Sequence, residues 1–335
     1  MAKIHPQSVK QNVQRFDEDV RESGGYAYTG NRLSARLAND RISRSIAESF
    51  DFRGKSVLDL GCGDGAYTVE FPSLGVRKIL GIDPAAGAVE AARNRAHTLG
   101  VSDVVSFEVG DIYALDEYLI PGNFDCIVIR GVLHHLPDPA AGLRALVSVL
   151  APGGGLGLMV YAPHGRTGVY MAQDALRHLA PAETPLAERI ETARRFLRSL
   201  HPEHWLARNA RLNDHIAGGD AGIVDLLLHA RDRAYTVPDL LALLDGAGLA
   251  PTALIEPARY DPATWLGDPR LRARAATLPW AERAALAEAA AGTIAVHIVY
   301  AVRAGAGWAP PDPADETRIP VLRELDGAAL AGQAG

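Results

Sequence analysis

The sequence predicts a doubly wound α/β fold with a mostly parallel, seven-stranded sheet whose last strand is antiparallel. Two observations carry this prediction. Short apolar runs alternate with amphipathic helical patterns from Lys55 onward, and such alternation builds a parallel sheet that is covered on both faces. A glycine-rich turn follows the first apolar run, where a sheet of this kind binds its ligand. A helical N-terminal cap and a helical insertion complete the predicted architecture.

The predicted strands are short apolar runs bounded by turn residues. They cover Ser56–Leu60, Lys78–Asp83, Val104–Val109, Phe124–Ile129, Gly155–Val160, Thr252–Ile255 and Thr293–Val302. Helices are predicted between the early strands, at Tyr67–Leu74, Ala85–Leu99 and Ala140–Leu150. A capping-box pattern at Thr236–Asp239 predicts the start of another helix. The last strand alternates in part, and we expect it to close the sheet in antiparallel fashion.

These patterns divide the chain into five stretches. We expect a helical cap over 1–50, a core over 51–163, a helical insertion over 164–235, the completion of the core over 236–303 and a tail over 304–335. The helical cap is predicted from the amphipathic pattern of Asn31–Phe50. The insertion is rich in Arg and His and has no strand pattern. The tail is rich in Ala, Gly and Pro, which is typical of loosely ordered segments.

Composition narrows the class of protein. The chain has 335 residues and is 48% hydrophobic, enough for a substantial core. Its 34 basic and 40 acidic side chains give a formal net charge of -6, which argues against general binding to a nucleic-acid backbone. Neither Cys62 nor Cys126 belongs to a CxxC pair, so we expect no disulfide framework and no cysteine zinc site.

The ends and the hydropathy of the chain bear on its location. The first residues are polar and lack the apolar stretch of a signal peptide. No apolar run is long enough to cross a membrane. We therefore expect a cytoplasmic protein without a membrane span. The sequence leaves the oligomeric state open, and a homodimer is one arrangement that it allows.

The informative motif is the turn after the first strand. Val57–Leu60 runs into Gly61, Gly63 and Gly65, with Asp59 two residues before the first glycine. Glycine is needed where the backbone bends sharply or approaches a ligand closely. The start of the following helix offers free N–H groups that suit a carboxylate.

Two further carboxylates stand at the ends of predicted strands. Asp83 ends the second strand, where a carboxylate accepts hydrogen bonds from ribose hydroxyls. Asp111 ends the third strand, where it is suited to accept from an adenine amino group while Ile112 packs on the ring. The GxGxG spacing differs from the GxGxxG fingerprint of dinucleotide dehydrogenases. These features speak against a nicotinamide-dependent oxidoreductase.

Together these segments resemble the class I, Rossmann-like methyltransferases that use S-adenosylmethionine. The matching pieces, in order, are the glycine turn, Gly81–Pro84, Gly110–Ile112, Phe124–Val128, Val132–Leu136 and Leu150–Gly154. The resemblance covers roughly 50–163 and resumes near 236–303. It implies S-adenosylmethionine as cofactor, S-adenosylhomocysteine as product and no metal.

The resemblance also implies roles for particular residues. Gly61 and Gly63, with the Cys62 backbone, would line the methionine portion, and Asp59 would help to fix the loop and the amino group. The other implied cofactor residues are Asp83 and Pro84 at the ribose, Asp111 and Ile112 at the adenine, and Arg130, Gly131 and Val132 near the sulfonium. Arg130 departs from the small polar residue usual in the family, and steering of a substrate anion is an alternative role for it.

Candidate acceptor-side residues come from three segments. His134 and His135 follow the fourth strand, and either is a candidate base because histidine titrates near neutrality; a structural role is the alternative. Tyr26, Tyr28 and Arg32 are candidates for a lid, with anchoring of an N-terminal helix as the alternative. His164, Arg166 and Tyr170 follow the fifth strand and are candidates for the acceptor pocket, with a turn and a solvated arginine as the alternative.

Other charged clusters have simpler interpretations. Asp225 and His229 stand four apart on a predicted helix, with Arg231, Asp232 and Arg233 beyond, and we interpret this group as a local ion-pair network because a metal site needs more convergent ligands. Arg194, Arg195 and Arg198 are interpreted as a solvated face.

The function predicted from the sequence is methyl transfer to an oxygen or nitrogen nucleophile of a small molecule. A protein or RNA acceptor is the first alternative, and a non-catalytic S-adenosylmethionine-binding protein is the second, because function lies in the site and not in the fold.

Overall fold

A computed structural model describes residues 52–210, 212 and 214–306 of the chain. The predicted cap over 1–50 lies outside the described residues, and so does the predicted tail (304–335) beyond its first three residues. The strands are β1 (Ser56–Leu60), β2 (Lys78–Asp83), β3 (Val105–Val109), β4 (Phe124–Arg130), β5 (Leu150–Tyr161), β6 (Leu249–Leu254) and β7 (Val296–Arg303).

The seven strands form one sheet in the order β3-β2-β1-β4-β5-β7-β6. Strands β1 to β5 pair in parallel, and β7 pairs antiparallel with both β5 and β6. The predicted sheet with an antiparallel last strand is therefore confirmed. The strand order reverses between β1 and β4, and the crevice beside such a reversal is where open α/β sheets bind ligands.

Alternating side chains along each central strand enter two separate cores, as the two-residue period of a strand requires. In β1, Leu58 and Leu60 belong to one core, and Val57 belongs to the core on the other face. Strand β4 repeats the pattern, with Ile127 in the first core and Val128 in the second. Both faces of the sheet are covered, which is the doubly wound arrangement.

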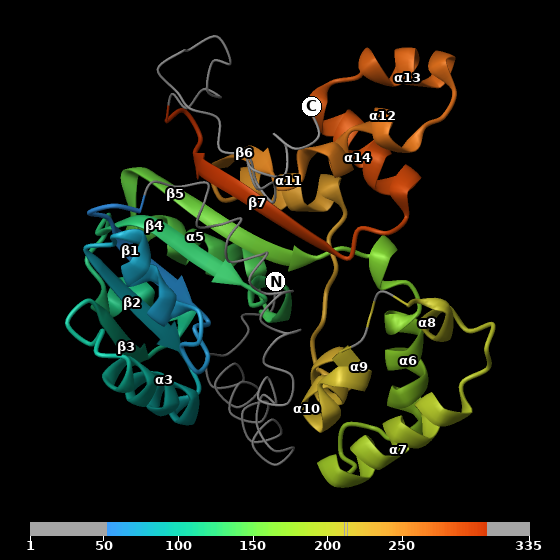
Figure 1. Ribbon diagram of the computed structural model, residues 1–335, viewed down its shortest axis with the longest axis horizontal. Coiled ribbons are helices and arrows are strands. Elements are labelled where there is room, and N and C mark those ends of the chain that lie inside the picture. The colour runs from blue at the N-terminus through green and yellow to red at the C-terminus, as the bar shows by residue number, and fades with distance from the viewer. Residues whose placement is uncertain (1–51, 211, 213, 307–335) are drawn as a thin grey trace, which may run out of the picture.

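Helices cover the two faces and form a separate group beside the sheet (Figure 1). The α-helices are α3 (Ala86–Thr98), α4 (Leu115–Tyr118), α5 (Pro139–Val149), α6 (Val169–Leu179), α7 (Leu186–Ser199), α8 (Trp205–Arg208), α9 (Asp214–Ala217), α10 (Gly219–Ile223), α11 (Val237–Asp245), α12 (Pro262–Trp265), α13 (Pro269–Ala276) and α14 (Trp280–Ala291). Short 3-10 turns are η1 (Thr68–Leu74), η2 (Ile112–Ala114), η3 (Leu133–His135), η4 (His164–Arg166) and η6 (Pro257–Tyr260), and η5 (Val224–Leu228) is a π-helix.

The segment between β5 and α11 has an apolar core of its own. Val169, Leu176, Ile190 and Leu227 pack there with other aliphatic residues of α6, α7, α8, α10 and η5. In Figure 1 these helices lie together below the sheet, apart from α12, α13 and α14. The described residues of this segment form helices from α6 to η5, and residues 229–236 after them have no helix or strand.

Three details depart from the predictions. The predicted helix at Tyr67–Leu74 is the 3-10 helix η1, which contains Pro72, and a residue without an N–H cannot support an α-helical ladder. Strand β5 begins at Leu150, before its predicted start, because Leu150 pairs with Phe124 across an irregular step in the register. Strand β6 includes Pro251, which an edge strand tolerates. The predicted capping box at the start of α11 is confirmed.

A buried polar group ties the last elements to the sheet. His297 of β7 is fully buried, with its Nδ1 2.9 Å from the Tyr260 hydroxyl and its Nε2 3.2 Å from Glu288 Oε1. Glu288 Oε2 accepts a hydrogen bond of 2.8 Å from the Val237 N–H at the start of α11. One carboxylate therefore joins α14, β7 and α11.

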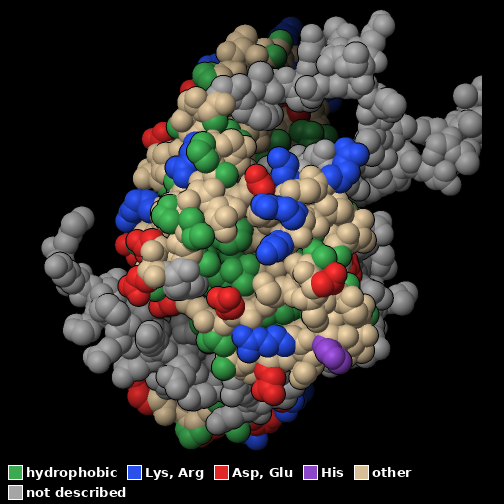
Figure 2. Space-filling model, turned by 90° about the vertical axis from the view of Figure 1, so that its left-hand side faces the viewer, with side chains coloured by type: hydrophobic (Ala, Val, Ile, Leu, Met, Phe, Trp, Pro, Cys, Tyr) green, Lys and Arg blue, Asp and Glu red, His purple; other side chains and the backbone are tan. Residues whose placement is uncertain are grey.

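Two surface observations complete the description. Figure 2 shows Lys and Arg side chains interspersed with Asp and Glu on the face at the left of Figure 1. Within the described part of the chain, no helix combines the length and the apolar character that a bilayer span requires.

Candidate functional site

The glycine turn after β1 has the backbone that only glycine adopts easily. Gly61 and Gly63 have φ of 72° and 54°, in the left-handed region. The Gly61 N–H donates to the Ile82 carbonyl at 2.7 Å. A Cβ added to Gly61 would lie 2.1 Å from Val132 Cγ2, whereas a Cβ added to Gly63 would meet no atom of the described residues within 4 Å. Gly61 is thus needed for packing, and Gly63 faces open space.

Asp59 lies beneath this turn at the end of β1. Its side chain is buried, and Oδ2 accepts a hydrogen bond of 2.6 Å from the Thr68 hydroxyl. Arg130 Nη2, from the end of β4, lies 3.5 Å from the same oxygen. The Arg130 guanidinium also lies over the Tyr67 ring, 4.5 Å from its centre. Arg130 is therefore anchored across the β1–β4 crevice, where the strand order reverses.

The strand-end carboxylates are held by backbone N–H groups. Asp83 accepts from the Gly63 N–H at 2.9 Å and from the Ala85 N–H at 3.0 Å. Asp111 accepts from the Tyr113 N–H at 2.9 Å. Because β1, β2 and β3 are parallel neighbours, the glycine turn and both carboxylates share one edge of the sheet.

The remaining residues implied for the cofactor differ in exposure. Ile112 and Cys62 are buried, Pro84 is exposed, and Gly131 has a φ of 69°. Burial, and secondarily the charges of Asp59 and Asp83, raise the pKa of the Cys62 thiol. Cys62 therefore stays a neutral thiol.

Three histidine rings lie close together just after β4, where His135 stacks on His229 and contacts His134 edge-on. The rings of His135 and His229 are 3.8 Å apart and nearly parallel, and the His134 ring lies 4.2 Å from that of His135. His134 is buried, and in the described part of the chain neither of its ring nitrogens has a hydrogen-bond partner. Burial, with smaller contributions from His135, Arg166 and His229, lowers the pKa of His134 well below its usual value. His134 is thus held neutral.

His135 has an asymmetric environment. Its Nδ1 lies 2.7 Å from the Arg231 carbonyl oxygen, so Nδ1 carries the hydrogen that is donated. When the ring is neutral, Nε2 then keeps its lone pair. His229 has the opposite arrangement, because its Nδ1 accepts from the Arg231 N–H at 3.0 Å. The peptide groups of Arg231 therefore engage both histidines.

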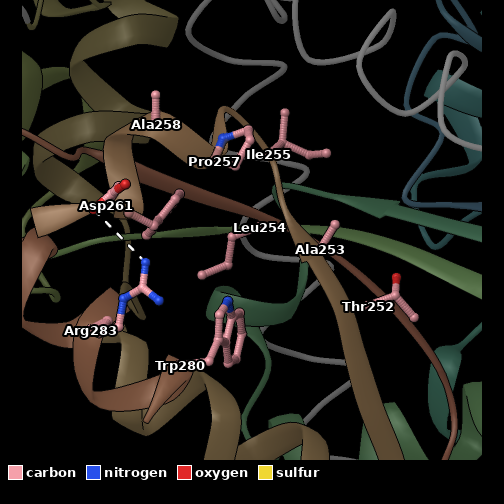
Figure 3. A pocket seen from close by; sticks show the side chains of 10 residues that line it. Thr252, Ala253, Leu254, Ile255, Pro257, Ala258, Asp261, Trp280 and Arg283 are labelled. Atoms are coloured by element: carbon pink, nitrogen blue, oxygen red, sulfur yellow. Dashed lines mark ion pairs between the residues drawn. The ribbon is translucent and has the colours of Figure 1, made fainter. Parts of the chain in front are cut away.

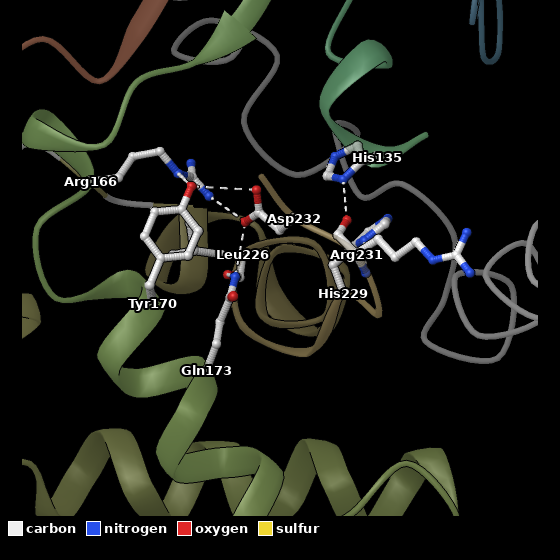
Figure 4. Close-up of polar contacts among 8 residues, drawn as sticks. All are labelled: His135, Arg166, Tyr170, Gln173, Leu226, His229, Arg231 and Asp232. Carbon is white, nitrogen blue, oxygen red and sulfur yellow. Dashed lines mark hydrogen bonds and ion pairs between the residues drawn. The ribbon is translucent and has the colours of Figure 1, made fainter. Parts of the chain in front are cut away.

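A buried ion pair lies next to these histidines (Figure 4). Arg166 Nη2 lies 3.0 Å from Asp232 Oδ2, with side-chain exposures of 3% and 0%. The Gln173 amide also donates to Asp232 Oδ2, at 2.9 Å. Arg166 Nε lies 3.3 Å from the Tyr170 hydroxyl, and burial is the main reason that the pKa of Tyr170 is raised to about 12.

Tyr161, at the end of β5, connects the ion pair to the histidines. The Arg166 guanidinium lies 3.6 Å from the centre of the Tyr161 ring, and the His134 ring lies 3.8 Å from it. Two planar groups so close to one ring centre occupy its opposite faces. Arg166, Tyr161 and His134 therefore form one stack, with a cation–π contact at one end.

The segment from Arg231 to Tyr235 runs along this stack. The Arg233 N–H donates to the His134 carbonyl at 3.2 Å, and the Tyr235 N–H donates to the Tyr161 carbonyl at 2.9 Å. The side chain of Asp232 points to the Arg166 end of the stack and to Gln173. These backbone contacts join the helical segment between β5 and α11 to the edge of the sheet.

The structure brings together some of the predicted acceptor-side residues and separates others. Arg166 and Tyr170 are in contact, but Arg166 is buried and ion-paired, so the alternative of a solvated arginine is wrong. His164 is exposed. Tyr26, Tyr28 and Arg32 lie outside the described residues.

The local network predicted for 225–235 is also revised, because Asp232 pairs with Arg166, which stands far away in the sequence. Arg194, Arg195 and Arg198 form exposed ion pairs, as the solvated-face interpretation predicts. Among the described residues, no group of three or more His, Cys, Asp or Glu is arranged to hold a metal.

A pocket of about 690 Å³ lies elsewhere, beside the edge strand β6. Figure 3 shows Trp280 and the Asp261–Arg283 pair at its wall. Its lining is Thr252, Ala253, Leu254, Ile255, Pro257, Ala258, Tyr260, Asp261, Trp280 and Arg283. None of the site residues predicted from the sequence lines it, so this pocket is distinct from the crevice at the strand ends.

Some residues of the site were not found from the sequence. Tyr67 and Thr68 contact Arg130 and Asp59, and Tyr161 and Gln173 complete the buried network. Tyr161 directly follows the predicted fifth strand, and that position was the available signal. Gln173 gave no signal, because a glutamine on a helix is ordinarily exposed.

Comparison with known proteins finds a family model and several relatives that match part of this chain. Residues 51–192 match a family model described as a methyltransferase domain. An uncharacterised protein of Synechococcus is 32% identical over 222 residues, which are 63% of this chain and 51% of that protein. The ubiquinone biosynthesis O-methyltransferase of Neisseria meningitidis is 36% identical over 104 residues, 31% of this chain and 43% of that enzyme.

The structure of PKMT2 from Rickettsia typhi in complex with AdoHcy has a TM-score of 0.61 at 16% identity, covering 78% of this chain and 52% of that one. At this identity, the likeness shows a shared fold. The chain spans about half the length of the curated relatives that it matches.

Proposed function

We propose that this chain methylates an oxygen or nitrogen nucleophile of a small molecule. Residues 51–192 match a methyltransferase-domain family, and S-adenosylmethionine is the methyl donor of the class I, Rossmann-like methyltransferases that the chain resembles. The observation that carries the proposal is the pairing of two neighbouring features. One is the glycine turn with carboxylates on the next two strand ends, and the other is His135 after β4, whose Nε2 has no hydrogen-bond partner among the described residues.

The crevice residues fit S-adenosylmethionine. The space in front of Gly63 would admit the methionine portion, and Asp59, buried beneath the turn, would fix the loop that receives it. Asp83 would accept from the ribose hydroxyls, and Asp111 would accept from the adenine amino group while Ile112 would pack on the ring. Arg130 is engaged with Asp59 and Tyr67, so its role is to shape the methionine end.

When bound, S-adenosylmethionine supplies a methyl group activated on a sulfonium, and S-adenosylhomocysteine is the product. The protein then has to align the acceptor and exclude water, and alignment is worth roughly 7–11 kcal/mol in model reactions. Arg166 and Tyr170 shape the acceptor side from α6 and the turn before it. Tyr26, Tyr28 and Arg32 are the proposed lid from the N-terminal stretch.

His135 is the proposed base when the acceptor is a hydroxyl. Its Nδ1–H donates to the Arg231 carbonyl, so Nε2 accepts the proton that the hydroxyl loses. His134 is unsuited to this role because it is buried between neighbouring rings and held neutral. An amine acceptor that is already neutral would not need His135.

Calorimetry tests the cofactor first. Titration of the folded protein with S-adenosylmethionine, S-adenosylhomocysteine and NAD should give heat with the first two only. Release of S-adenosylhomocysteine on addition of cell extract, fractionated by size, then tests the acceptor. Activity in the low-mass fraction supports the proposal, activity confined to macromolecules replaces the acceptor class, and no heat with either adenosyl ligand refutes the function.

A further inference from the structure

We propose that Asp232 is a positioning residue that sets the ring orientation and the tautomer of His135, acting through the backbone carbonyl of Arg231. This inference rests on the proposed function, because it concerns the same histidine. It assigns a role in the reaction to a buried ion pair that lies in the helical segment, outside the matched strand-end motifs.

The first step of the argument is the tautomer. Which ring nitrogen of a neutral histidine carries the proton is set by the hydrogen bond that the other nitrogen makes. The Arg231 carbonyl is 2.7 Å from His135 Nδ1 and accepts only, so it selects the form with the proton on Nδ1. Among the described residues, Nε2 makes no hydrogen bond, and it is the nitrogen with the available lone pair.

The second step is what holds that carbonyl in place. Residues 231–235 have no regular secondary structure, so contacts outside a helix or a strand must fix them. The side chain next to the carbonyl, Asp232, accepts from Arg166 at 3.0 Å and from Gln173 at 2.9 Å, and Tyr170 lies 3.5 Å away. Gln173 also donates to the Leu226 carbonyl at 2.9 Å.

The third step is energetic. Removing two charges from water costs several kcal/mol per ion, and a well-packed apolar pair of similar size would often stabilise a fold as well. The Arg166–Asp232 pair is nonetheless buried, and Asp232 is the residue directly after Arg231, whose carbonyl oxygen contacts His135 Nδ1. Fixing geometry accounts for this placement better than stability does.

The alternatives within the network are less direct. Arg166 itself is turned toward Tyr161, Tyr170 and Asp232 and is 3% exposed, which leaves little surface for a ligand. His229 engages the N–H of Arg231 and stacks on His135, so it supports the same backbone from the other side. Asp232 is the charged group whose loss releases the carbonyl.

Nitrogen-15 NMR of the full chain labelled at histidine tests the proposal without an acceptor. His135 signals are identified by their loss in His135→Gln. The wild type should hold His135 with the proton on Nδ1, and Asp232→Asn should convert a large part of it to the Nε2–H form. The control is Asp220→Asn, which removes an exposed ion pair of the same segment with Arg194 and should leave His135 unchanged.

Asp232→Asn leaves Arg166 buried without its counter-ion, so folding is checked by near-ultraviolet circular dichroism. If that variant fails to fold, Arg166→Met with Asp232→Leu removes both charges together and gives the same readout. Unchanged His135 signals in a folded variant of either kind would overturn the proposal.

Measurements of kcat distinguish the positioning role of Asp232 from the proposed methyltransferase function on which it rests. In the extract fraction that supports S-adenosylhomocysteine release, His135→Gln should lower kcat on the order of 100-fold. Asp232→Asn should lower kcat about tenfold if a tenth of His135 keeps the productive tautomer, with unchanged S-adenosylhomocysteine affinity and an altered pH profile. In the His135→Gln background the Asp232 change should have no further effect.

Each failure has its own meaning. A wild type that releases no S-adenosylhomocysteine refutes the function, and normal turnover by His135→Gln refutes the base. An equal loss from Asp232→Asn with and without His135 refutes only the positioning role, because the effect then does not pass through the histidine.

Discussion

Alanine at Gly61 and at Gly63 should have different consequences, although both glycines have positive φ. Placing a side chain in the left-handed region costs about 1–2 kcal/mol at either site. At Gly61 the new Cβ would also lie 2.1 Å from Val132 Cγ2, and relief of such an overlap costs typically about 1–3 kcal/mol. At Gly63 no atom of the described part of the chain lies within 4 Å of the new Cβ, so the second cost is not expected.

The expected loss in the free energy of unfolding is therefore about 3 kcal/mol for Gly61→Ala and about 1.5 kcal/mol for Gly63→Ala. Urea denaturation of the ligand-free protein measures both values. Calorimetry with S-adenosylhomocysteine should show the reverse order for the folded variants. Gly63→Ala should lose at least tenfold in affinity, about 1.4 kcal/mol, because its methyl group enters the space proposed for the ligand.

A double variant isolates the overlap. Val132→Ala in the Gly61→Ala background removes the atom that the new Cβ meets, so the two changes together should cost less than the sum of the single losses. Equal destabilisation by the two glycine variants would refute the packing argument. Wild-type affinity of Gly63→Ala for S-adenosylhomocysteine would refute the placement of the ligand.

Two other predictions concern stability. Glu288→Ala leaves the Val237 N–H and the His297 ring without their buried acceptor, so the free energy of unfolding should fall by about 3 kcal/mol in urea titrations; a loss below about 1 kcal/mol would contradict the structural role of the carboxylate. The second prediction follows from the lowered pKa values of His134 and His229, which are caused mainly by burial. Below pH 6.5, the ordinary pKa of histidine, the unfolded chain binds more protons than the folded chain. The free energy of unfolding should therefore be constant above that pH and should fall as the pH drops, by about 1.4 kcal/mol per histidine at pH 5.5. His134→Leu should remove about half of this decline, and an unchanged decline would contradict it.

The cofactor side could be predicted because its signals are local. The apolar runs of β1 and β2 end where expected, since each is bounded by residues that break strands, and the turn needs glycine for steric reasons. Parallel pairing then brings the ends of neighbouring strands to one edge, whatever separates them in sequence. The proximity of the glycine turn to Asp83 could therefore be predicted without any knowledge of side-chain contacts.

The acceptor side could not be predicted in the same way. Charged side chains are usually solvated, and from this rule the sequence offered a solvated Arg166 as one alternative and placed Asp232 in a local ion-pair network. Tertiary packing overrides the rule here, because the two charges satisfy each other and Gln173 supplies a further donor. Periodicity reports which face of a helix is apolar, and it carries no information about which buried charge meets which.

The two sides of the site also differ in what a substitution would change. The shape of the turn at Gly61 and Gly63 depends on their left-handed backbone conformation. Substitutions in distant helices are therefore not expected to change it. His135 is held by a carbonyl of residue 231, and that carbonyl depends on side chains from α6. Since the helical segment has its own apolar core, it is able to vary without disturbing the sheet. Substitutions that change which acceptor is methylated are therefore expected in this helical segment, while the residues proposed to bind the methyl donor stay the same.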